Sequence, residues 1–345
     1  MKTDPTNPSD FTSKAHHCAI EERLCILLAT FNGEAYLAEQ IESIVSQTHT
    51  NWVLIIRDDN SKDSTRQIVE RFCHEDSRII LLQDHASAGS AKINFSRLME
   101  HARAREERYF LCCDQDDVWQ PYKLSTLFSR MLNIESNTHV SQPVLLHSDL
   151  EVVDKNLACI AESFIKFMRI DPGTQLHPDR LLSRNEVTGC SCIFNRQLLE
   201  AALPIPEEAI MHDWWLALVA AYFGHLRFCN DPLVKYRQHG NNVVGAKSFW
   251  HGLNPFNNWR QGWKMGNKEF MATIHQARAF LLLLIEKKYI EQGQVNRVHA
   301  YLSIPEQGVL DRLKCLFHVR VFRGHLLLDL VLILRVLLLP REKKQ

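Results

Sequence analysis

Apolar runs alternate with helix-period segments along the first third of the chain. Four unbroken apolar runs are typical of fully buried strands: residues 24–29, 52–56, 78–82 and 108–113. Three stretches space their apolar residues by three or four positions, as amphipathic helices do: residues 34–47, 63–72 and 91–104. Repeated strand–helix–strand spacing with wholly apolar strands predicts a parallel sheet that is covered by helices on both faces.

The pattern changes twice further along the chain. Residues 140–245 hold the strand-like PVLLHSDL, VTGCSCIFN and PLVKYRQHG and the helix-like HDWWLALVAAYFG. Helical patterns dominate from there to the end. We therefore expect an α/β domain over residues 22–245 and a helical C-terminal region over 246–345, preceded by a polar, flexible tail at residues 1–21.

The C-terminal region contains an almost wholly apolar stretch from Leu326 to Leu339. At 14 residues, with Asp329 and Arg335 inside it, the stretch is shorter than a membrane span, which needs about 20 residues. Basic residues bracket it: Arg320, Arg323, Arg341, Lys343 and Lys344. Apolar residues between basic flanks predict a membrane-associating helix over about 320–344 that lies in the lipid interface. A helix that packs on the protein's own core is the alternative.

Composition narrows the class of protein. Lys+Arg and Asp+Glu are equal at 40 each, so the chain has no overall charge that favours nucleic acid. The ten cysteines form no CxxC pair, so no zinc site is predicted and most thiols are expected to be buried and structural. The N-terminus lacks the apolar run of a signal peptide, which predicts a cytoplasmic protein.

Three aspartates, Asp114, Asp116 and Asp117, follow the fourth predicted strand directly. Residues two apart point the same way on an extended chain, so we expect Asp114 and Asp116 to converge and Asp117 to face the opposite side. Two converging carboxylates suit Mg²⁺ or Mn²⁺, which keep open positions for phosphate oxygens. Capping of the helix that opens near Pro121 is the alternative, but one cap accounts for only one aspartate.

The segments ATFN, RDDNS and DQDD follow the first, second and fourth predicted strands. Ligands of parallel sheets bind at the carboxyl ends of the strands, so these segments are expected at one edge. The sequence contains no Walker loop and no GxGxxG, so a glycine cradle for phosphate is not predicted. A nucleoside diphosphate held by a metal ion fits instead, with Asp58 or Asp59 accepting from the base or ribose. A polar turn that caps the next helix is the simpler interpretation of RDDNS.

The segments ILLATFNGEAYLAEQIESIVSQT, IIRDDNSKDST and LCCDQDDVW resemble, in order and spacing, the motifs of the family 2 glycosyltransferases with the GT-A fold. HDWWLALVAAYFG and YRQHGNNVVG are similar to the rhamnosyltransferase-like subgroup. The resemblance covers about residues 22–245. It implies a GT-A type, Rossmann-like and mostly parallel sheet flanked by helices, with a helical C-terminal extension. It also implies inverting, metal-dependent sugar transfer in the synthesis of bacterial surface polysaccharide or lipopolysaccharide O-antigen.

The resemblance implies roles for individual residues. Contacts to the nucleotide sugar fall on Thr30, Phe31, Asn32, Glu34, Asp58, Asp59, Asp114, Gln115 and Asp116. The metal ligands fall on Asp114, Asp116 and His239. Asp213 stands where the family has its catalytic base, although His212 replaces the more usual glutamate. The acceptor side falls on Trp214, Trp215, Thr188 and Gly189, with one indole expected at the site and the other in the core.

The resemblance also implies the partners of the protein. The donor is expected to be dTDP-rhamnose or a UDP-sugar, and the acceptor a lipid-linked saccharide at the inner face of the cell membrane. A phosphohydrolase would carry its D-x-D after the first strand, and a sugar nucleotidyltransferase would carry a glycine-rich basic loop there, unlike ATFNGEAY. A non-catalytic nucleotide-sugar-binding protein would lack Asp213. The last two classes are kept as alternatives.

Overall fold

The first four strands build one half of a continuous sheet. The computed structural model describes residues 22–84, 86–138, 142–170, 178–239, 259–288, 292–322 and 326–340, and the predicted tail at 1–21 lies outside them. The strands are β1 (Leu24–Thr30), β2 (Trp52–Asp58), β3 (Ile79–Leu81) and β4 (Tyr109–Cys113). They lie in the order β3-β2-β1-β4 and are parallel, as the buried apolar runs predict.

Helices cover both faces of this half, which confirms the predicted layers. They are α2 (Leu37–Val45), α3 (Thr65–Glu75) and α4 (Ala91–Arg103). The apolar sides of α2 and α3 share one core with alternate residues of the strands, whereas α4 belongs to a core on the opposite face. Each strand therefore contributes to two cores, and this is why its apolar run is unbroken rather than alternating.

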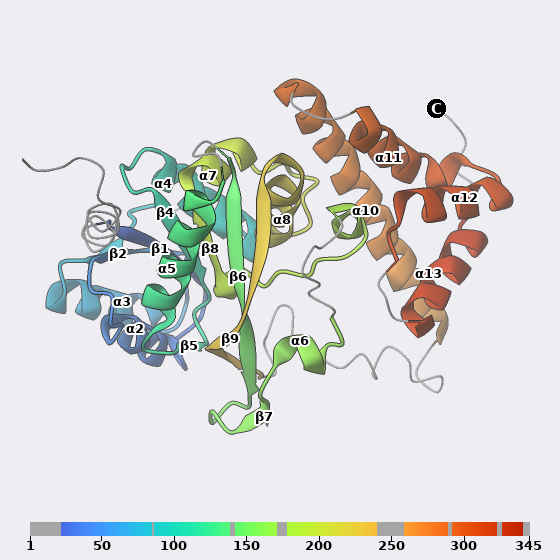
Figure 1. Cartoon of the computed structure of the whole chain (residues 1–345). Helices are drawn as coiled ribbons and strands as arrows, with labels where there is room; N and C mark the ends of the chain where they lie inside the picture. The colour runs from blue at the N-terminus through green and yellow to red at the C-terminus, as the bar shows by residue number, and fades with distance from the viewer. Residues whose placement is uncertain are drawn as a thin grey trace, which may run out of the picture.

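The second half of the sheet is mixed. Its strands are β5 (Val118–Trp119), β6 (Val144–Val153), β7 (Cys159–Ala161), β8 (Cys192–Asn195) and β9 (His225–Arg237). β8 pairs antiparallel with β4 and β6, and β9 runs parallel to β6. The order along the sheet is β3-β2-β1-β4-β8-β6-β9-β5, and β7 pairs with β6 outside this order. Figure 1 shows β6 and β9 as two long neighbouring strands that extend past the ends of β1 and β4.

Short helices complete this domain. They are α5 (Lys123–Ser136), α6 (Phe164–Phe167), α7 (Arg196–Ala202) and α8 (His212–Phe223), with 3₁₀ turns η1 (Pro178–Leu182) and η2 (Gly189–Ser191). The predicted helix HDWWLALVAAYFG is therefore confirmed as α8. It is buried over most of its surface, which agrees with its lack of a polar face.

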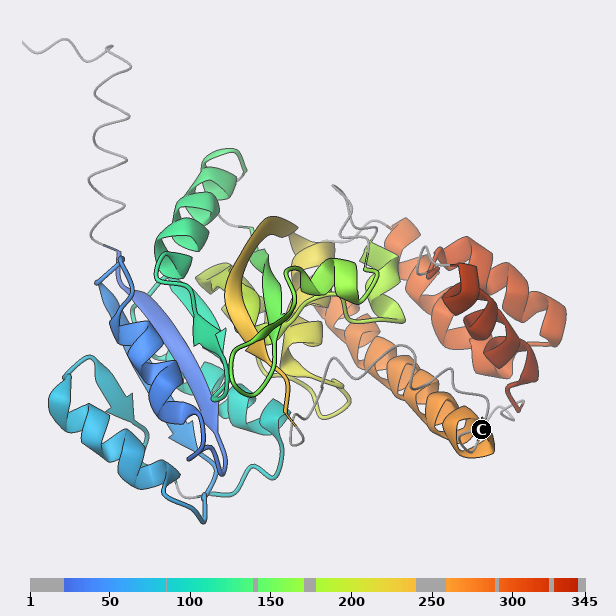
Figure 2. The same ribbon diagram turned by 90° about the horizontal axis from the view of Figure 1, so that it is seen from below.

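The C-terminal region is helical, as predicted, over its described residues. It contains α10 (Trp259–Lys287), α11 (Gln292–Ser303), η3 (Ile304–Glu306), α12 (Val309–Val319) and α13 (Leu326–Leu338). Figures 1 and 2 show these helices grouped on one side of the sheet domain. Phe280 of α10 packs edge-on against Trp215 and Tyr222 of α8, and Arg297 of α11 pairs with the buried Asp179 at 2.6 Å. These contacts join α10 and α11 to α8 and η1 of the sheet domain.

One side of helix α13 packs against other parts of the same chain. Leu332, Val336 and Leu339 are buried, and the buried guanidinium of Arg312 donates to the carbonyl oxygens of Val336 and Leu339. No helix among the described residues is long and apolar enough to cross a membrane. The outer side of α13 exposes leucines at four-residue spacing: Leu326, Leu330, Leu334 and Leu338. Of the predicted basic flanks, Arg323, Arg341, Lys343 and Lys344 lie outside the described residues.

Candidate active site

The loops that follow β1, β2 and β4 meet at one edge of the sheet, as predicted. Gln115 connects the first and the third of them. Its Oε1 accepts from Thr30 Oγ1 at 2.7 Å and from the Phe31 amide at 2.8 Å, and its Nε2 donates to the Phe31 carbonyl at 3.1 Å. A side chain at Gly33 would displace the Gln115 amide, because a Cβ there would lie 2.4 Å from Gln115 Oε1. Gln115 therefore sets the distance between the β1 loop and the aspartates.

The β1 and β2 loops are joined by a second set of hydrogen bonds. The Asn32 amide donates to Ser61 Oγ at 2.8 Å, Asn32 Oδ1 accepts from the Lys62 amide at 2.8 Å, and Glu34 Oε2 accepts from the Ser64 amide at 2.9 Å. Both Asn32 and Asn60 adopt positive φ, at 48° and 60°, which asparagine tolerates. The side chain of Phe31 is 53% exposed beside these loops.

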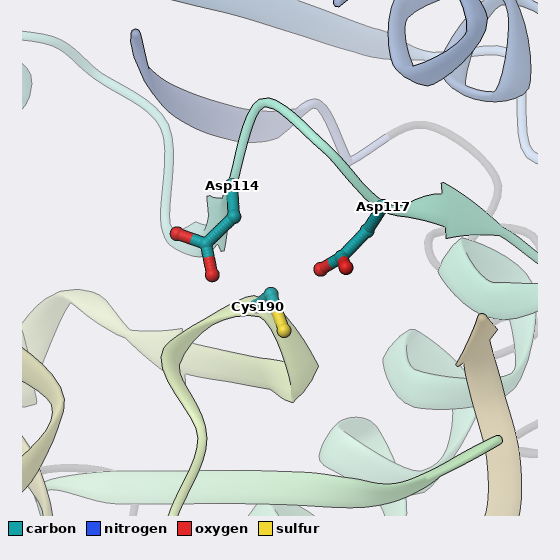
Figure 3. Close-up of side chains that lie close together, drawn as sticks. All are labelled: Asp114, Asp117 and Cys190. Atoms are coloured by element: carbon teal, nitrogen blue, oxygen red, sulfur yellow. The ribbon is translucent and has the colours of Figure 1, made fainter. Parts of the chain in front are cut away.

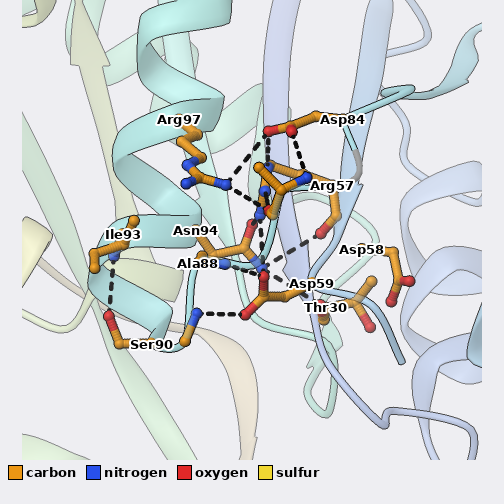
Figure 4. Close-up of polar contacts among 12 residues, drawn as sticks. Thr30, Arg57, Asp58, Asp59, Asp84, Ala88, Ser90, Ile93, Asn94 and Arg97 are labelled. Carbon is orange, nitrogen blue, oxygen red and sulfur yellow. Dashed lines mark hydrogen bonds and ion pairs between the residues drawn. The ribbon is translucent and has the colours of Figure 1, made fainter. Parts of the chain in front are cut away.

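The two aspartates at the end of β2 accept hydrogen bonds from the protein itself. Asp58 accepts from the amide and hydroxyl of Ser61. Asp59 accepts from the amides of Ala88 and Gly89, in the loop before α4. Figure 4 shows Asp59 turned toward this loop and Asp58 turned away from it. Their contact with base and ribose stays a prediction. In the structure, Asp58 stabilises the loop after β2, and Asp59 joins that loop to the one before α4.

The buried Arg57 organises the same region. Its Nε donates to Asp84 at 2.8 Å and its Nη1 donates to Asn94 Oδ1 at 2.9 Å, with Asp59 at 3.5 Å (Figure 4). Asn94 in turn donates to the backbone carbonyl of Thr30 at 3.3 Å. One buried cation thus connects β2, the β3 loop and α4, because its fork of donors reaches all three.

The acidic turn after β4 differs from the prediction in one respect. Asp114 and Asp117 face each other, and the Cys190 thiol of η2 lies beside them, with their ligand atoms all within 4.8 Å of one another (Figure 3). The expectation that Asp117 faces the opposite side is therefore wrong. Residues 114–117 form a bend rather than an extended segment, so the alternation of side chains does not hold there.

Asp116 meets His239, which is distant in sequence. The His239 Nε2 atom lies 2.7 Å from Asp116 Oδ2, and its ring packs against Tyr36 with the centroids 4.9 Å apart. Two of the predicted metal ligands are therefore neighbours, and Asp114 is close enough for the charge of Asp116 to raise its pKa. Cys190 is a poorer ligand for a hard ion, because burial and the nearby aspartates raise the pKa of its thiol well above the usual value.

The electrostatics of the turn fit a divalent cation. Burial, and then the charges of Asp116 and Asp213, raise the pKa of Asp114 to about 7. Burial also raises the pKa of Asp117 well above its ordinary range; one of its oxygens accepts from the Arg237 amide at 3.1 Å, and the other is buried without a hydrogen-bond partner among the described residues. Crowded carboxylates with unused oxygens and a nearby imidazole are a ligand set for Mg²⁺ or Mn²⁺.

The buried side chain of Arg237 holds this turn in place, a role that the sequence pattern did not indicate. Its Nε donates to the Asp116 carbonyl at 2.8 Å, its Nη1 donates to the Lys155 carbonyl at 2.7 Å, and it pairs with Glu39 of α2. Its guanidinium lies 4.5 Å from the centroid of the Tyr36 ring. The same residue thus fixes the backbone of the acidic turn and the aromatic ring against which His239 packs.

Asp213 lies in the first turn of α8 and is held by several donors. Its Oδ2 accepts from the Gly189 amide at 3.0 Å, and its Oδ1 accepts from the Trp214 amide at 2.6 Å and from Asn185 Nδ2 at 3.0 Å. Burial raises its pKa to about 6 against the lowering effect of these donors. A carboxylate with this pKa is mostly ionised at neutral pH and is still a useful proton acceptor.

Of the other residues predicted for the acceptor side, Gly189 and Trp214 contact Asp213 through their backbone amides. Trp215 is buried and donates to the Ala202 carbonyl at 2.9 Å, so it is the core indole, whereas Trp214 is only partly buried and donates to the Leu181 carbonyl at 2.6 Å. Thr188 precedes the η2 turn. Gly189 must be a glycine, because a Cβ would lie 2.8 Å from His212 Nε2, and His212 is stacked on Phe95 at 4.0 Å.

We expect transfer to depend on pH through Asp213. A base must be ionised to accept a proton, so kcat/KM should be constant at neutral pH and fall as the pH drops through about 6, the pKa to which burial raises this carboxyl. The measurement is kcat/KM between pH 5 and 8 at saturating Mn²⁺. A profile that stays flat down to pH 5 would contradict the assignment.

Comparison with known proteins identifies the class that this fold and site define. The model of "Glycosyl transferase family 2" matches residues 25–200. The dTDP-rhamnosyl transferase RfbG of Shigella flexneri is 28% identical over 228 residues, which are 64% of this chain and 74% of that protein. The UDP-Glc:alpha-D-GlcNAc-diphosphoundecaprenol beta-1,3-glucosyltransferase WfgD of Escherichia coli is 30% identical over 131 residues, 38% of this chain and 47% of that protein.

The fold has a counterpart among solved structures. TarS of S. aureus, residues 1–349 in complex with UDP, superposes with a TM-score of 0.51 at 16% identity, covering 81% of this chain and 70% of that one. The architecture is that of the GT-A glycosyltransferases, as predicted. The chain belongs to glycosyl transferase family 2.

Proposed function

We propose that the protein is an inverting, metal-dependent glycosyltransferase that moves a sugar from a nucleoside diphosphate to a saccharide hydroxyl in the synthesis of bacterial surface polysaccharide. The observation that carries this proposal is that two kinds of carboxylate site lie close together: a cluster of aspartates and the single carboxylate of Asp213. A crowded acidic turn lies at the meeting of three loops, and Asp213, fixed by three donors, lies close enough for its charge to raise the pKa of Asp114.

The acidic turn serves the donor. Asp114, Asp116 and His239 would hold the cation, which when bound offsets the charge of the leaving diphosphate. Asp117 is a further oxygen donor close to Asp114, since their ligand atoms lie within 4.8 Å of each other. The exposed ring of Phe31 and the braced loops with Asp58 and Asp59 provide the surface for base and ribose.

Asp213 serves the acceptor. Its carboxylate takes the proton of the acceptor hydroxyl while that oxygen attacks the anomeric carbon from the side opposite the diphosphate, so the new bond has inverted configuration. General base catalysis of this kind contributes about 10²–10⁴-fold in rate. The partly buried Trp214, with Thr188 and Gly189, borders the acceptor.

The donor is proposed to be dTDP-rhamnose and the acceptor to be lipid-linked. The first is supported by the 28% identity to a dTDP-rhamnosyl transferase over 64% of this chain. The second is supported by the similarity to a transferase whose acceptor is a diphosphoundecaprenol saccharide. A UDP-sugar is the competing donor, because WfgD is named for UDP-Glc.

A donor panel tests the proposed function. Purified protein is incubated with Mn²⁺ and either dTDP-rhamnose, UDP-glucose, UDP-N-acetylglucosamine or GDP-mannose, and release of the nucleoside diphosphate is measured. We expect release from dTDP-rhamnose to be fastest, and faster release from a UDP-sugar would overturn the rhamnose assignment. Formation of a nucleotide sugar from a nucleoside triphosphate would indicate a nucleotidyltransferase. Binding of a donor without any turnover would indicate a non-catalytic binding protein.

The exposed leucines of α13 are proposed to rest on the cytoplasmic surface of the inner membrane. Leu326, Leu330, Leu334 and Leu338 form an apolar stripe, and their exposed fractions range from 47% to 79%. Residues 311–345 contain eight Lys/Arg against three Asp/Glu, a charge that suits anionic headgroups. A helix with one side on the protein and leucines on the other can lie in the lipid interface.

We expect the protein to co-sediment with vesicles of phosphatidylglycerol and phosphatidylethanolamine at low salt. The variant Leu326→Ser/Leu330→Ser/Leu334→Ser should lose this binding and retain nucleotide binding, because these side chains do not belong to the buried core. Leu282→Ser on α10, where the leucine is 66% exposed, is the matched control and should still bind. Wild-type protein that does not co-sediment with such vesicles would overturn the membrane proposal.

A further inference from the structure

We propose that Asn185 is a positioning residue that orients the Asp213 carboxylate for proton transfer from the acceptor. The inference rests on the proposed role of Asp213 as the base. Asn185 lies in the segment SRNEVT that connects η1 to η2.

The amide of Asn185 is fixed at both ends. Its Nδ2 donates to Asp213 Oδ1 at 3.0 Å, and its Oδ1 accepts from the Val187 amide at 3.0 Å. The Val187 N–H requires an acceptor, so the amide oxygen must face it and the NH₂ group must face the carboxylate. The same bonds exclude the flipped amide, which would place two acceptors together.

The loop that carries Asn185 is itself anchored. Glu186 pairs with Arg180 at 2.7 Å, and its side chain is only 1% exposed. Val187 is buried in the core shared with α8, and Ser183 Oγ donates to the Val321 carbonyl at 3.1 Å. Because the residues on both sides of Asn185 are held in place, its amide keeps a fixed position. A group that orients a catalytic base needs such a fixed position.

The distribution of donors indicates which oxygen takes the proton. Oδ1 of Asp213 accepts from two donors, Trp214 N–H and Asn185 Nδ2, whereas Oδ2 accepts from the Gly189 amide. A carboxylate oxygen accepts about two hydrogen bonds. The bond from Asn185 therefore fills the second acceptor position of Oδ1, so Oδ2 is the oxygen that accepts from the acceptor hydroxyl.

The groups that face Asp213 explain why a neutral donor serves here. Asp114 and Cys112 of the β4 end and Cys192 of β8 are near enough for the charge of Asp213 to raise their pKa values. His212 on the same helix is buried, and burial lowers its pKa to about 3, so it is uncharged at neutral pH. None of these groups is a cation, so hydrogen bonds hold the ionised base.

Removing the Asn185 donor should impair catalysis and spare binding. We expect Asn185→Ala to lower kcat by about ten- to a hundred-fold, since a small misplacement of a catalytic group has effects of this size. The KM for donor and the Mn²⁺-dependent affinity for the nucleoside diphosphate should stay within twofold of wild type. Asn156→Ala, in the exposed turn between β6 and β7, is the matched control and should behave as wild type.

A double-mutant cycle with Asp213→Asn decides between positioning and a merely structural role. If Asn185 acts through the base, Asn185→Ala should have less than a twofold effect in the Asp213→Asn background, measured with radiolabelled donor. An equal loss in both backgrounds, a loss of nucleotide affinity, or full activity of Asn185→Ala would overturn the inference. Asn185→Ser replaces alanine in the cycle if the latter does not fold. An Asp213→Asn enzyme with wild-type activity would instead refute the proposed function.

Discussion

Replacing Asp213 with asparagine should lower turnover by about 10²–10⁴-fold. The substitution keeps the shape of the side chain and the acceptor for the Trp214 amide, but an amide cannot take a proton from the acceptor hydroxyl. Donor binding should be unchanged, because Asp213 lies in α8 and outside the loops that form the donor side. Initial rates with saturating donor and acceptor, together with calorimetry of the nucleoside diphosphate, measure both quantities.

The control for Asp213→Asn is Asp231→Asn. Asp231 pairs with Arg130 at the surface, with both side chains about half exposed, so its loss should have little effect. Activity of Asp213→Asn within tenfold of wild type, with an unchanged pH profile, would show that another group takes the proton.

The Asp116→Asn variant should lose metal-dependent nucleotide binding altogether. Asp116 contributes charge to the acidic turn and bonds His239 at 2.7 Å, so the substitution removes a charged ligand and weakens the placement of a second. The fold should persist, because Arg237 holds the turn through the backbone carbonyl of Asp116 rather than through its carboxylate. Calorimetry with dTDP or UDP, with and without Mn²⁺, measures the effect.

Asp231→Asn again provides the control, and it should show the same gain in affinity on addition of Mn²⁺ as wild type. Asp116→Asn should show only the metal-free affinity. An undiminished response to Mn²⁺ in Asp116→Asn would remove this residue from the metal site and leave Asp114 and Asp117 as the carboxylates to test.

Local patterns predicted the first half of the sheet because each strand there is buried on two faces. Unbroken apolar runs such as residues 52–56 have no other stable placement between amphipathic helices. For the second half, the pattern predicted where the strands lie in the sequence but not their order in the sheet. That β8 joins β4 and β6 in antiparallel pairs depends on pairing between segments far apart in the chain, and apolar runs do not encode the partner or direction of a strand.

The site was predicted in its parts rather than in its arrangement. The patterns predicted the edge at which the three loops meet, and two of the implied metal ligands, Asp116 and His239, lie 2.7 Å apart. That they bind a metal ion stays a prediction. The orientation of Asp117 was wrong because the local bend could not be recognised in DQDD. Asn185 and Arg237 were missed, since one resembles a turn residue and the other a residue near the end of a strand. Their roles rest on bonds to residues 28 and 121 positions away, and only the folded chain reveals such bonds.

A divalent cation and a nucleoside diphosphate should together occupy the meeting point of the three loops. Anomalous scattering from crystals of the protein with Mn²⁺ and dTDP or UDP tests it most directly. We expect one strong manganese peak in contact with Asp116, His239 and the diphosphate, with the base beside Phe31. A nucleotide bound there without manganese, or a manganese peak away from the acidic turn, would contradict it.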